Sequence, residues 1–343
     1  MKKILVTGGC GYIGSHTIID LIDNGYDIVS IDDFSNAHPS SIDHIKAITG
    51  RSILNYSVDL KDIEAAREVF RKEGPFAGII HFAAYKLVGE SVEKPLTYFR
   101  NNLLSLLNIL ECMREFETDN FIFSSSCSVY GNSRELPVTE LTPRQEAESP
   151  YGRTKQMGED ILRDVSRLLG HPKTVLLRYF NPAGAHESGL HGEDPANKAS
   201  NLVPVITETA IGKRDKMMVF GTDYHTRDGS CVRDYIHVMD LAAAHTLALQ
   251  YLLDNRNQDT CEIFNLGIGE GVTVLEAIQA FEKVTGHNLA YELGPRRPGD
   301  VEAIYANYNK AADRLRWQPK RNIKDIMATA WKWEQHRSTS PPS

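Results

Sequence analysis

A glycine-rich turn near the N-terminus constrains the fold of this 343-residue chain most strongly. Gly8, Gly11 and Gly14 are spaced three residues apart, between an apolar run at 4–7 and an amphipathic segment at 12–24. Glycine lets the backbone turn tightly and approach a pyrophosphate, while a helix N-terminus supplies donors and positive potential. The pattern therefore predicts a strand–turn–helix unit that binds a dinucleotide; without its flanks, such a triplet could be a plain turn.

Short apolar runs alternate with longer amphipathic segments through the first half of the chain. Such alternation predicts an α/β, doubly wound parallel sheet of the Rossmann type, covered by helices on both faces. The expected strands are 4–7, 28–31, 53–58, 78–82, 121–124 and 174–179, and the expected helices are 12–24, 63–72, 95–116 and 150–169.

The pattern loosens after Phe180, where glycine and proline interrupt segments of mixed character. We expect residues 1–180 to form a dinucleotide-binding domain and residues 181–337 a smaller, C-terminal substrate-binding domain. A regular piece near 234–251 is expected to pack back on the first domain. The Ser/Pro-rich residues 338–343 predict a disordered tail.

Composition narrows the class of protein. A formal net charge of −7 argues against a nucleic-acid surface, and no apolar run approaches the ~20 residues that span a bilayer. The N-terminus enters a strand and a glycine turn directly, so we expect no signal peptide. Five scattered cysteines without a Cys-x-x-Cys pair make a disulfide frame or a metal cluster improbable and fit a cytoplasmic location.

Acidic and basic residues after the strands predict the choice of cofactor. Asp32 lies 18 residues past Gly14, where a carboxylate can bind an adenosine ribose and repel a 2′-phosphate, which favours NAD over NADP. Capping of a loop is the alternative for Asp32. Lys86 could bind phosphate or ribose, or be a solvated loop residue. The expected carboxyl-end positions of the third and fourth strands are Asp59, Leu60, Phe82, Ala83 and Ala84.

Tyr151 and Lys155 lie one helical turn apart in a segment whose helix start is marked by Ser149 and Pro150. A unit charge at ~4 Å and an effective dielectric of ~20 contributes about 4 kcal/mol, or roughly 3 pKa units. We therefore expect Lys155 and the helix dipole to bring the pKa of the phenol towards neutrality, where it acts as a general base. A surface Tyr–Lys pair is the alternative.

A run of serines supplies a third candidate group. Ser124–Ser126 ends the expected strand before this helix, so a hydroxyl there faces the same crevice as Tyr151. It could bridge Tyr151 and a substrate oxygen, whereas turn formation is the alternative reading for one or two of the serines.

These motifs together give a specific resemblance, which extends to about Trp333. The chain resembles the extended short-chain dehydrogenase/reductase family at Thr7–His16, Asp32–Asn36, Phe123–Ser126, Val129–Gly131 and Ser149–Lys155. More narrowly, it resembles the UDP-glucose (UDP-galactose) 4-epimerase group of that family at Arg178–His186 and Asp228–Val238.

The resemblance implies an isomerase with a tightly held NAD that is not net consumed. Tyr151 would take the proton of the sugar 4-hydroxyl as hydride leaves C4, and hydride would return to the opposite face of the 4-keto sugar. Ser126 would polarise the C4 oxygen and relay the proton, and Lys155 would hold the nicotinamide ribose. A homodimer is implied through helices such as 95–116 and 150–169.

The resemblance also implies two sets of binding residues. The cofactor set is Gly8, Gly11, Tyr12, Ile13, Gly14, Asp32, Asp33, Phe34, Ser35, Asn36, Asp59, Leu60, Phe82, Ala83, Ala84, Lys86, Asn101, Tyr151, Lys155 and Phe180. The UDP-sugar set is Lys86, Ser126, Tyr151, Asn181, Asn201, Leu202, Phe220, Arg233, Arg297 and Asp300.

Other activities on the same fold are disfavoured by particular residues. Related dehydratases and decarboxylases carry an acid beside the catalytic Ser or Thr, where this chain has Cys127 and Ser128. The epimerase-like second half argues against a simple reductase, and a non-catalytic NAD-binding scaffold would not need Tyr151 and Lys155. The choice between plain and N-acetylated UDP-hexoses stays open, because Ile304 is neither the Tyr nor the Cys or Ser usual there.

Overall fold

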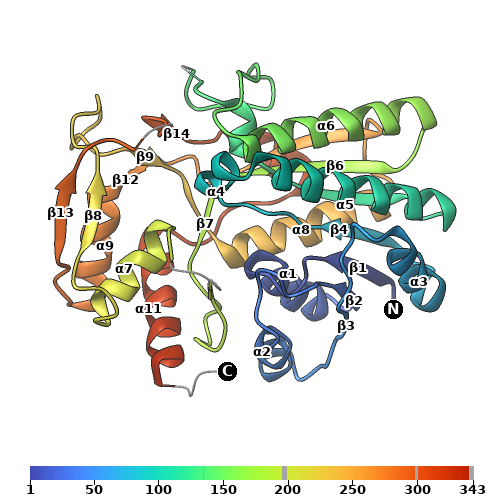
Figure 1. Ribbon diagram of the computed structural model, residues 1–343, viewed down its shortest axis with the longest axis horizontal. Helices are drawn as coiled ribbons and strands as arrows, with labels where there is room; N and C mark the ends of the chain where they lie inside the picture. Colours follow the sequence, from blue (N-terminus) through green and yellow to red (C-terminus); the bar gives the residue numbers. More distant parts are fainter. Residues whose placement is uncertain (134, 195–198, 298–299, 340–343) are drawn as a thin grey trace.

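The computed structural model describes residues 1–133, 135–194, 199–297 and 300–339. Its centre is a seven-stranded sheet in the order β11-β6-β5-β4-β1-β2-β3, and every neighbouring pair is parallel (Figure 1). The expected doubly wound fold is therefore confirmed. The strands are β1 (Lys3–Thr7), β2 (Asp27–Ile31), β3 (Leu54–Tyr56), β4 (Gly78–His81), β5 (Asn120–Ser126), β6 (Lys173–Tyr179) and β11 (Cys261–Leu266).

Alternation of apolar side chains along the strands builds a core on each face of the sheet. Ile4 and Val6 of β1 join one core, while Leu5 between them joins the other. The first core is closed by α1 (Tyr12–Asp23) and α8 (Val238–Leu253). The second is closed by α3 (Ile63–Glu73), α5 (Pro95–Glu115) and α6 (Pro150–Leu169).

Two strand predictions need correction. β3 ends at Tyr56, before the expected Val58, because it is the edge strand and the Val58 N–H donates to the Tyr56 carbonyl oxygen instead of to a neighbour (2.9 Å). The chain directly after Phe180, where the strand pattern was expected to loosen, forms a short strand of its own, β7 (Asn181–Ala183). β7 pairs with β10 (Tyr235–His237), which lies in the regular piece near 234–251.

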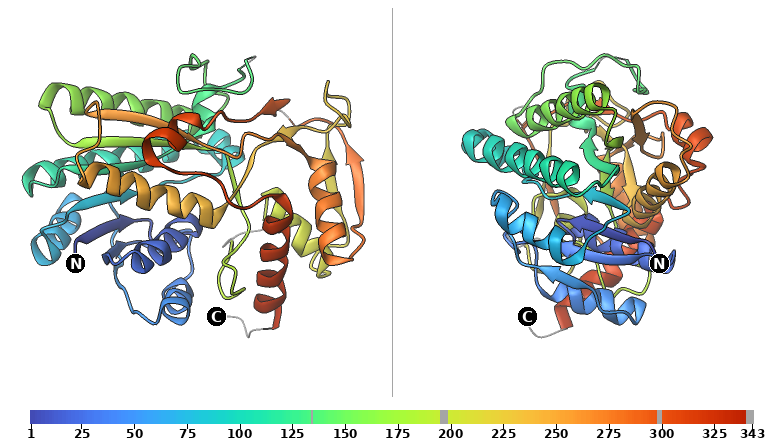
Figure 2. Two further views of the ribbon diagram at one scale, coloured as in Figure 1. Left: turned by 180° about the vertical axis from the view of Figure 1, so that it is seen from behind. Right: turned by 90° about the vertical axis from the view of Figure 1, so that its right-hand side faces the viewer.

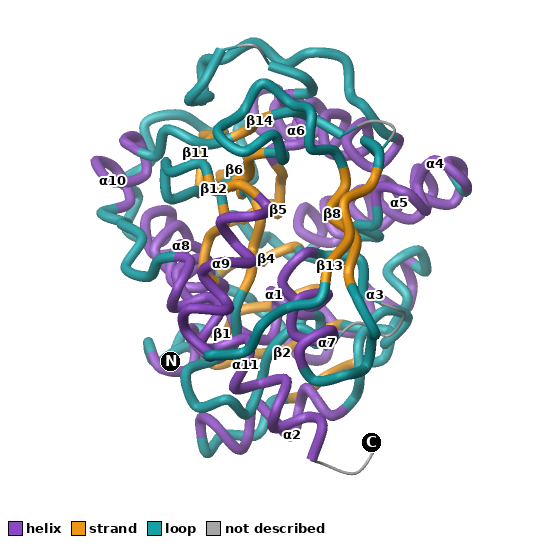
Figure 3. The backbone as a smooth tube through the Cα atoms, turned by 90° about the vertical axis from the view of Figure 1, so that its left-hand side faces the viewer, coloured by secondary structure: helices purple, strands orange, loops and turns teal. Residues whose placement is uncertain are grey.

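A third core lies in the later part of the chain, beyond one end of the main sheet (Figure 3). It packs α7 (Leu202–Ala210), α9 (Val274–Thr285) and α11 (Ile323–Thr339) against small sheets. α11 includes Ser338 and Thr339 of the expected tail, and 340–343 lie outside the described residues. The remaining strands are β8 (Met217–Phe220), β9 (Val232–Arg233), β12 (Val272–Thr273), β13 (Tyr291–Gly294) and β14 (Ala303–Ile304). The other helices are α2 (Ser40–Thr49), α4 (Val88–Glu93), α10 (Asn309–Leu315) and the 3-10 turn Cys127–Tyr130.

The chain returns to the main sheet twice after residue 181. α8 packs along α1, and β11 adds the seventh strand beside β6 (Figure 2, left). The strand β11 was not among the expected strands. Within the described ranges, no helix has the length and apolar character needed to cross a membrane.

Candidate active site

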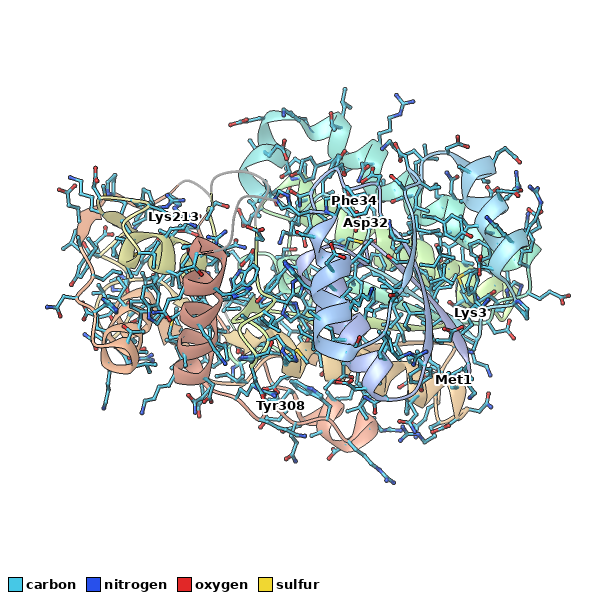
Figure 4. All side chains as sticks on the ribbon, turned by 90° about the horizontal axis from the view of Figure 1, so that it is seen from below. Met1, Lys3, Asp32, Phe34, Lys213 and Tyr308 are labelled. Atoms are coloured by element: carbon cyan, nitrogen blue, oxygen red, sulfur yellow. The ribbon has the colours of Figure 1, made fainter. Side chains whose placement is uncertain are left out.

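A cavity of about 430 Å³ opens at the carboxyl ends of the parallel strands. It is lined by the glycine turn, the ends of β2, β4 and β5, the start of α6, and the loop before α7. In Figure 4, Asp32 and Phe34 lie at the opposite end of the strands from Lys3, where β1 begins. The predicted residues that line the cavity are Gly8, Gly11, Tyr12, Ile13, Gly14, Asp32, Asp33, Ser35, Asn36, Asp59, Leu60, Phe82, Ala83, Ala84, Lys86, Asn101, Ser126, Tyr151, Lys155, Phe180, Asn181 and Asn201.

The glycine turn leaves no room for side chains at two positions. Gly8 has a φ of +68°, and a Cβ on it would lie 2.7 Å from the backbone nitrogen of Ala83. A Cβ on Gly14 would lie 2.2 Å from the Gly8 carbonyl oxygen. The turn at Gly8 is thus packed tightly against the residues that follow β4, and the start of α1 is packed against the turn. These residues fit the pyrophosphate of a dinucleotide.

Asp32 holds the loop that follows β2. Its Oδ2 accepts a hydrogen bond from the Cys10 N–H and its Oδ1 accepts one from the Phe34 N–H, both at 2.9 Å. Each oxygen keeps a lone pair, so the carboxylate can still bind a ribose hydroxyl. Burial raises the pKa of Asp32, and the backbone donors oppose that shift. Asp32 thus both caps the loop and faces the cavity, so the two readings of this residue are compatible.

Ser126, Tyr151 and Lys155 meet at the wall of the cavity. Ser149 caps α6 as expected, its Oγ accepting from the Gly152 N–H at 3.1 Å, and this places Tyr151 in the first turn. The side chains of Ser126 and Tyr151 lie close enough to interact at this wall. The Nζ of Lys155 lies 5.9 Å from the centre of the Tyr151 ring and donates to the backbone carbonyl oxygen of Ser124 at 2.6 Å.

The expected lowering of the Tyr151 pKa is wrong for this geometry. Burial raises the pKa of Tyr151 to about 12, and the hydrogen bond from Ser126 only partly opposes it. Burial also lowers the pKa of Lys155 to about 7. The physical reason is that both groups leave water, which disfavours phenolate and ammonium alike. The spacing of the pair predicted its contact but could not predict its desolvation.

Six predicted residues lie outside the lining of this cavity: Phe34, Leu202, Phe220, Arg233, Arg297 and Asp300. Four of them form two contacts of their own. The guanidinium of Arg297 lies 4.1 Å from the centre of the Phe220 ring, and Arg233 donates to Asp300 at 3.0 Å. Burial raises the pKa of Cys127, a cavity residue, and the charge of Arg233 partly opposes that shift, so Arg233 lies close to the cavity.

Comparison with known proteins agrees with this geometry. The family model described as GDP-mannose 4,6 dehydratase matches residues 5–330. UDP-glucose 4-epimerase 2 of Arabidopsis thaliana is 46% identical over 335 residues, which cover 97% of this chain and 95% of the relative. The chain belongs to this family and, within it, to the UDP-glucose 4-epimerases.

Solved structures of this epimerase family superpose on nearly the whole chain. The Bifidobacterium longum UDP-glucose 4-epimerase, in complex with NAD+ and UDP, has a TM-score of 0.94 and 43% identity, with 98% of this chain and 99% of that chain covered. The Stenotrophomonas maltophila epimerase, with bound NAD and formylated UDP-arabinopyranose, has a TM-score of 0.95 and 40% identity, with the same coverage. The extended fold, including the part after residue 181, is therefore that of the epimerases.

Glu193 is a cavity residue that the sequence analysis of this epimerase missed. Its Oε1 accepts from the Asn201 side chain at 2.7 Å and lies 3.6 Å from the Nζ of Lys86. It thereby joins one residue of the first half to one of the second across the cavity. Glu193 stands in a loop without periodicity or a recognisable motif, so the sequence carries no signal for it.

Proposed function

We propose that this chain is an NAD-dependent isomerase that interconverts UDP-glucose and UDP-galactose through a 4-keto intermediate. The observation that carries this proposal is the meeting of Ser126, Tyr151 and Lys155 on the wall of a cavity that also holds the glycine turn. Membership of the UDP-glucose 4-epimerases and the NAD and UDP-sugars named for solved relatives support it.

The three catalytic residues take complementary roles in this proposal. Tyr151 accepts the proton of the sugar 4-hydroxyl and later returns it, while Ser126 donates a hydrogen bond to the C4 oxygen. Lys155 contributes positive charge on the buried side of the phenol. The glycine turn and Asp32 would hold NAD, whose chemistry there is the reversible two-electron oxidation of the C4 alcohol.

The group beside the cavity suits the uridine diphosphate. Arg233 and Arg297 carry guanidinium forks that match a pyrophosphate in charge and geometry. Phe220 offers an aromatic face, and Asn201 and Leu202 begin α7 at the edge of the cavity. We assign these residues, with Asn181, Lys86 and Asp300, to the UDP-sugar.

Elimination of water is less well supported, although the matching family model takes its description from a dehydratase. That reaction needs an acid next to the catalytic serine, and the two residues after Ser126 are Cys127 and Ser128. Burial raises the pKa of the Cys127 thiol to about 11, so this group keeps its proton at neutral pH and is a poor acid.

Three broader assignments accompany this proposal. We divide the chain near residue 181 into an NAD-binding part and a UDP-sugar-binding part, with α8 and β11 packed on the first. Exposed leucines on α5 and α6, such as Leu96 and Leu168, suit a homodimer formed through these helices. A cytoplasmic location is in keeping with the five free cysteines. Light scattering tests the homodimer.

The decisive experiment is incubation of the purified protein with UDP-galactose and no added cofactor. We expect UDP-glucose to form, and we expect NAD to be released in about equimolar amount when the protein is denatured. Formation of no UDP-glucose, together with release of no NAD, would contradict the proposed function and favour a binding protein on the same fold.

A further inference from the structure

A fully buried carboxylate lies two helical turns beyond the catalytic tyrosine. Tyr151, Lys155 and Glu159 are spaced by four residues, so they share one face of α6. Glu159 has no exposed surface, yet it faces the sheet as an acid rather than as an apolar residue. Charged side chains are almost never fully buried unless they are paired, so this position calls for an explanation.

Each oxygen of Glu159 is engaged by a neighbouring strand. Its Oε1 accepts from the Oγ of Ser125 and from the Nε of Arg178, both at 2.7 Å. Its Oε2 accepts from the Nη2 of Arg178 at 2.5 Å. Ser125 and Arg178 are register partners on β5 and β6, so one carboxylate ties α6 to both strands.

Ser125, which donates a hydrogen bond to Glu159, lies between two residues that contact the active site. Ser125 is preceded by Ser124, whose carbonyl oxygen accepts a hydrogen bond from the ammonium of Lys155, and is followed by Ser126, which lines the cavity beside Tyr151. The end of β5 therefore carries both contacts, and the Ser125 side chain ties it to the same face of α6. A shift of this anchor would move both catalytic contacts at once.

The charge of Glu159 also acts on Lys155. Burial lowers the pKa of Lys155 to about 7, and the negative charge of Glu159 opposes that shift. The other titratable groups that face the pair, from α6 and from the elements packed against it, are Tyr151, His81 on β4, Tyr179 and Arg178 on β6, Arg144, Arg163 and Cys261.

We propose that Glu159 is a positioning residue of this active site: it fixes the end of β5 through Ser125. Its negative charge, one helical turn from Lys155, also favours the charged form of that lysine. This inference rests on the proposed epimerase function and adds a residue to it. Arg178 stabilises the buried carboxylate because it donates a hydrogen bond to each oxygen of Glu159. The guanidinium is itself packed against Tyr130, 4.8 Å from the centre of that ring.

Two variants separate the two parts of this role. Ser125→Ala removes only the anchor, and we expect turnover of UDP-galactose to fall about tenfold with an unchanged pH profile. Glu159→Gln keeps an acceptor for Ser125 but removes the charge. We expect the high-pH limb of kcat, where Lys155 loses its proton, to move about one unit lower, with little change in KM.

Matched controls exclude general damage to the fold. Asp160→Asn makes the same acid-to-amide change at the next, exposed position of α6 and should leave kcat and its pH profile unchanged. If Glu159→Gln alone does not fold, the double variant Glu159→Gln with Arg178→Met removes both buried charges. Loss of the Arg178 cation offsets part of the loss of the carboxylate, so a smaller shift in the same direction is expected. Bound NAD and thermal melting confirm folding in each case.

The outcomes distinguish this inference from the proposed function. A native protein without epimerase activity would refute the function itself. An active native protein, combined with native turnover in Ser125→Ala and an unmoved pH limb in the charge variants, would refute the role of Glu159. Native turnover in Ser125→Ala alone already removes the anchoring part, since that small change leaves the ion pair in place.

Discussion

The ammonium of Lys155 donates a 2.6 Å hydrogen bond to the backbone carbonyl oxygen of Ser124, two residues before Ser126. The lysine thus spans from α6 to β5 beneath the phenol. Because burial raises the pKa of Tyr151 to about 12 and lowers that of Lys155 to about 7, the proton resides on the phenol in this geometry. When bound, NAD+ would add positive charge near the phenol and favour its deprotonated form.

Loss of the Tyr151 hydroxyl should stop proton transfer without emptying the cofactor site. For Tyr151→Phe we expect kcat to fall by at least the ~10²-fold typical of a lost general acid–base group. The aromatic ring stays, so bound NAD should be retained. Steady-state turnover of UDP-galactose and the NAD released on denaturation are the two measurements. Turnover near that of the native protein would remove Tyr151 from its role.

The carboxylate of Asp32 should determine how firmly the cofactor is held. Asp32→Asn keeps a hydrogen-bond acceptor but loses the charge, so we expect weaker retention of NAD and weaker rejection of NADP. Asp27→Asn, at the opposite end of β2, is the matched control and should retain NAD like the native protein. Dialysis followed by measurement of bound nucleotide tests this. Equal retention in both variants would assign Asp32 to the loop alone.

Local sequence predicted those parts of the site that depend on a single element. The cap at Ser149 and the four-residue spacing of Tyr151 and Lys155 are properties of one helix, so their placement followed from the sequence. The orientation of Lys155 towards the Ser124 carbonyl and the desolvation of the phenol depend on how α6 packs against β5. No pattern within either segment encodes that contact.

The strand β11 shows why part of the fold could not be predicted. Its buried residues include Glu262 and Asn265, which are polar and disturb the apolar pattern that marks a central strand. Tyr251 donates to Glu262 at 3.0 Å, and Tyr130 donates to Asn265 at 2.6 Å. Both partners are distant in sequence or on another element, and they satisfy polar groups that would otherwise be costly to bury.

Buried histidines should make the protein sensitive to acid. Burial lowers the pKa of His16 and His245 to about 4 and that of His81 and His237 to about 3, against about 6.5 in the unfolded chain. Between those values the unfolded state binds protons that the folded state excludes. The contribution of these histidines to the free energy of unfolding is therefore fully present above about pH 6.5 and is lost as the pH falls towards 4.

Each such histidine contributes a slope of up to about 1.4 kcal/mol per pH unit within that window. Asp234 acts in the opposite direction, because burial raises its pKa to about 6. Urea unfolding at pH 7 and pH 5.5 measures the net effect. His245→Phe removes one buried imidazole and should reduce the change in the free energy of unfolding between the two pH values. Equal stability of the native protein at both pH values would contradict this prediction.

The size of the residue at position 304 should influence the choice of sugar. Ile304 is buried on β14 in an apolar cluster with Phe180, a residue that lines the cavity, and its register partner on β9 is Arg233. We expect the native protein to turn over UDP-glucose and UDP-galactose with higher kcat/KM than their N-acetylated counterparts. Ile304→Tyr adds a larger, hydroxylated side chain to this cluster and should lower any N-acetylhexosamine turnover further. Ile304→Val is the matched control that keeps the branched shape. Kinetics on both substrate pairs decide the question, and a strong preference of the native protein for N-acetylated sugars would reverse the expected order.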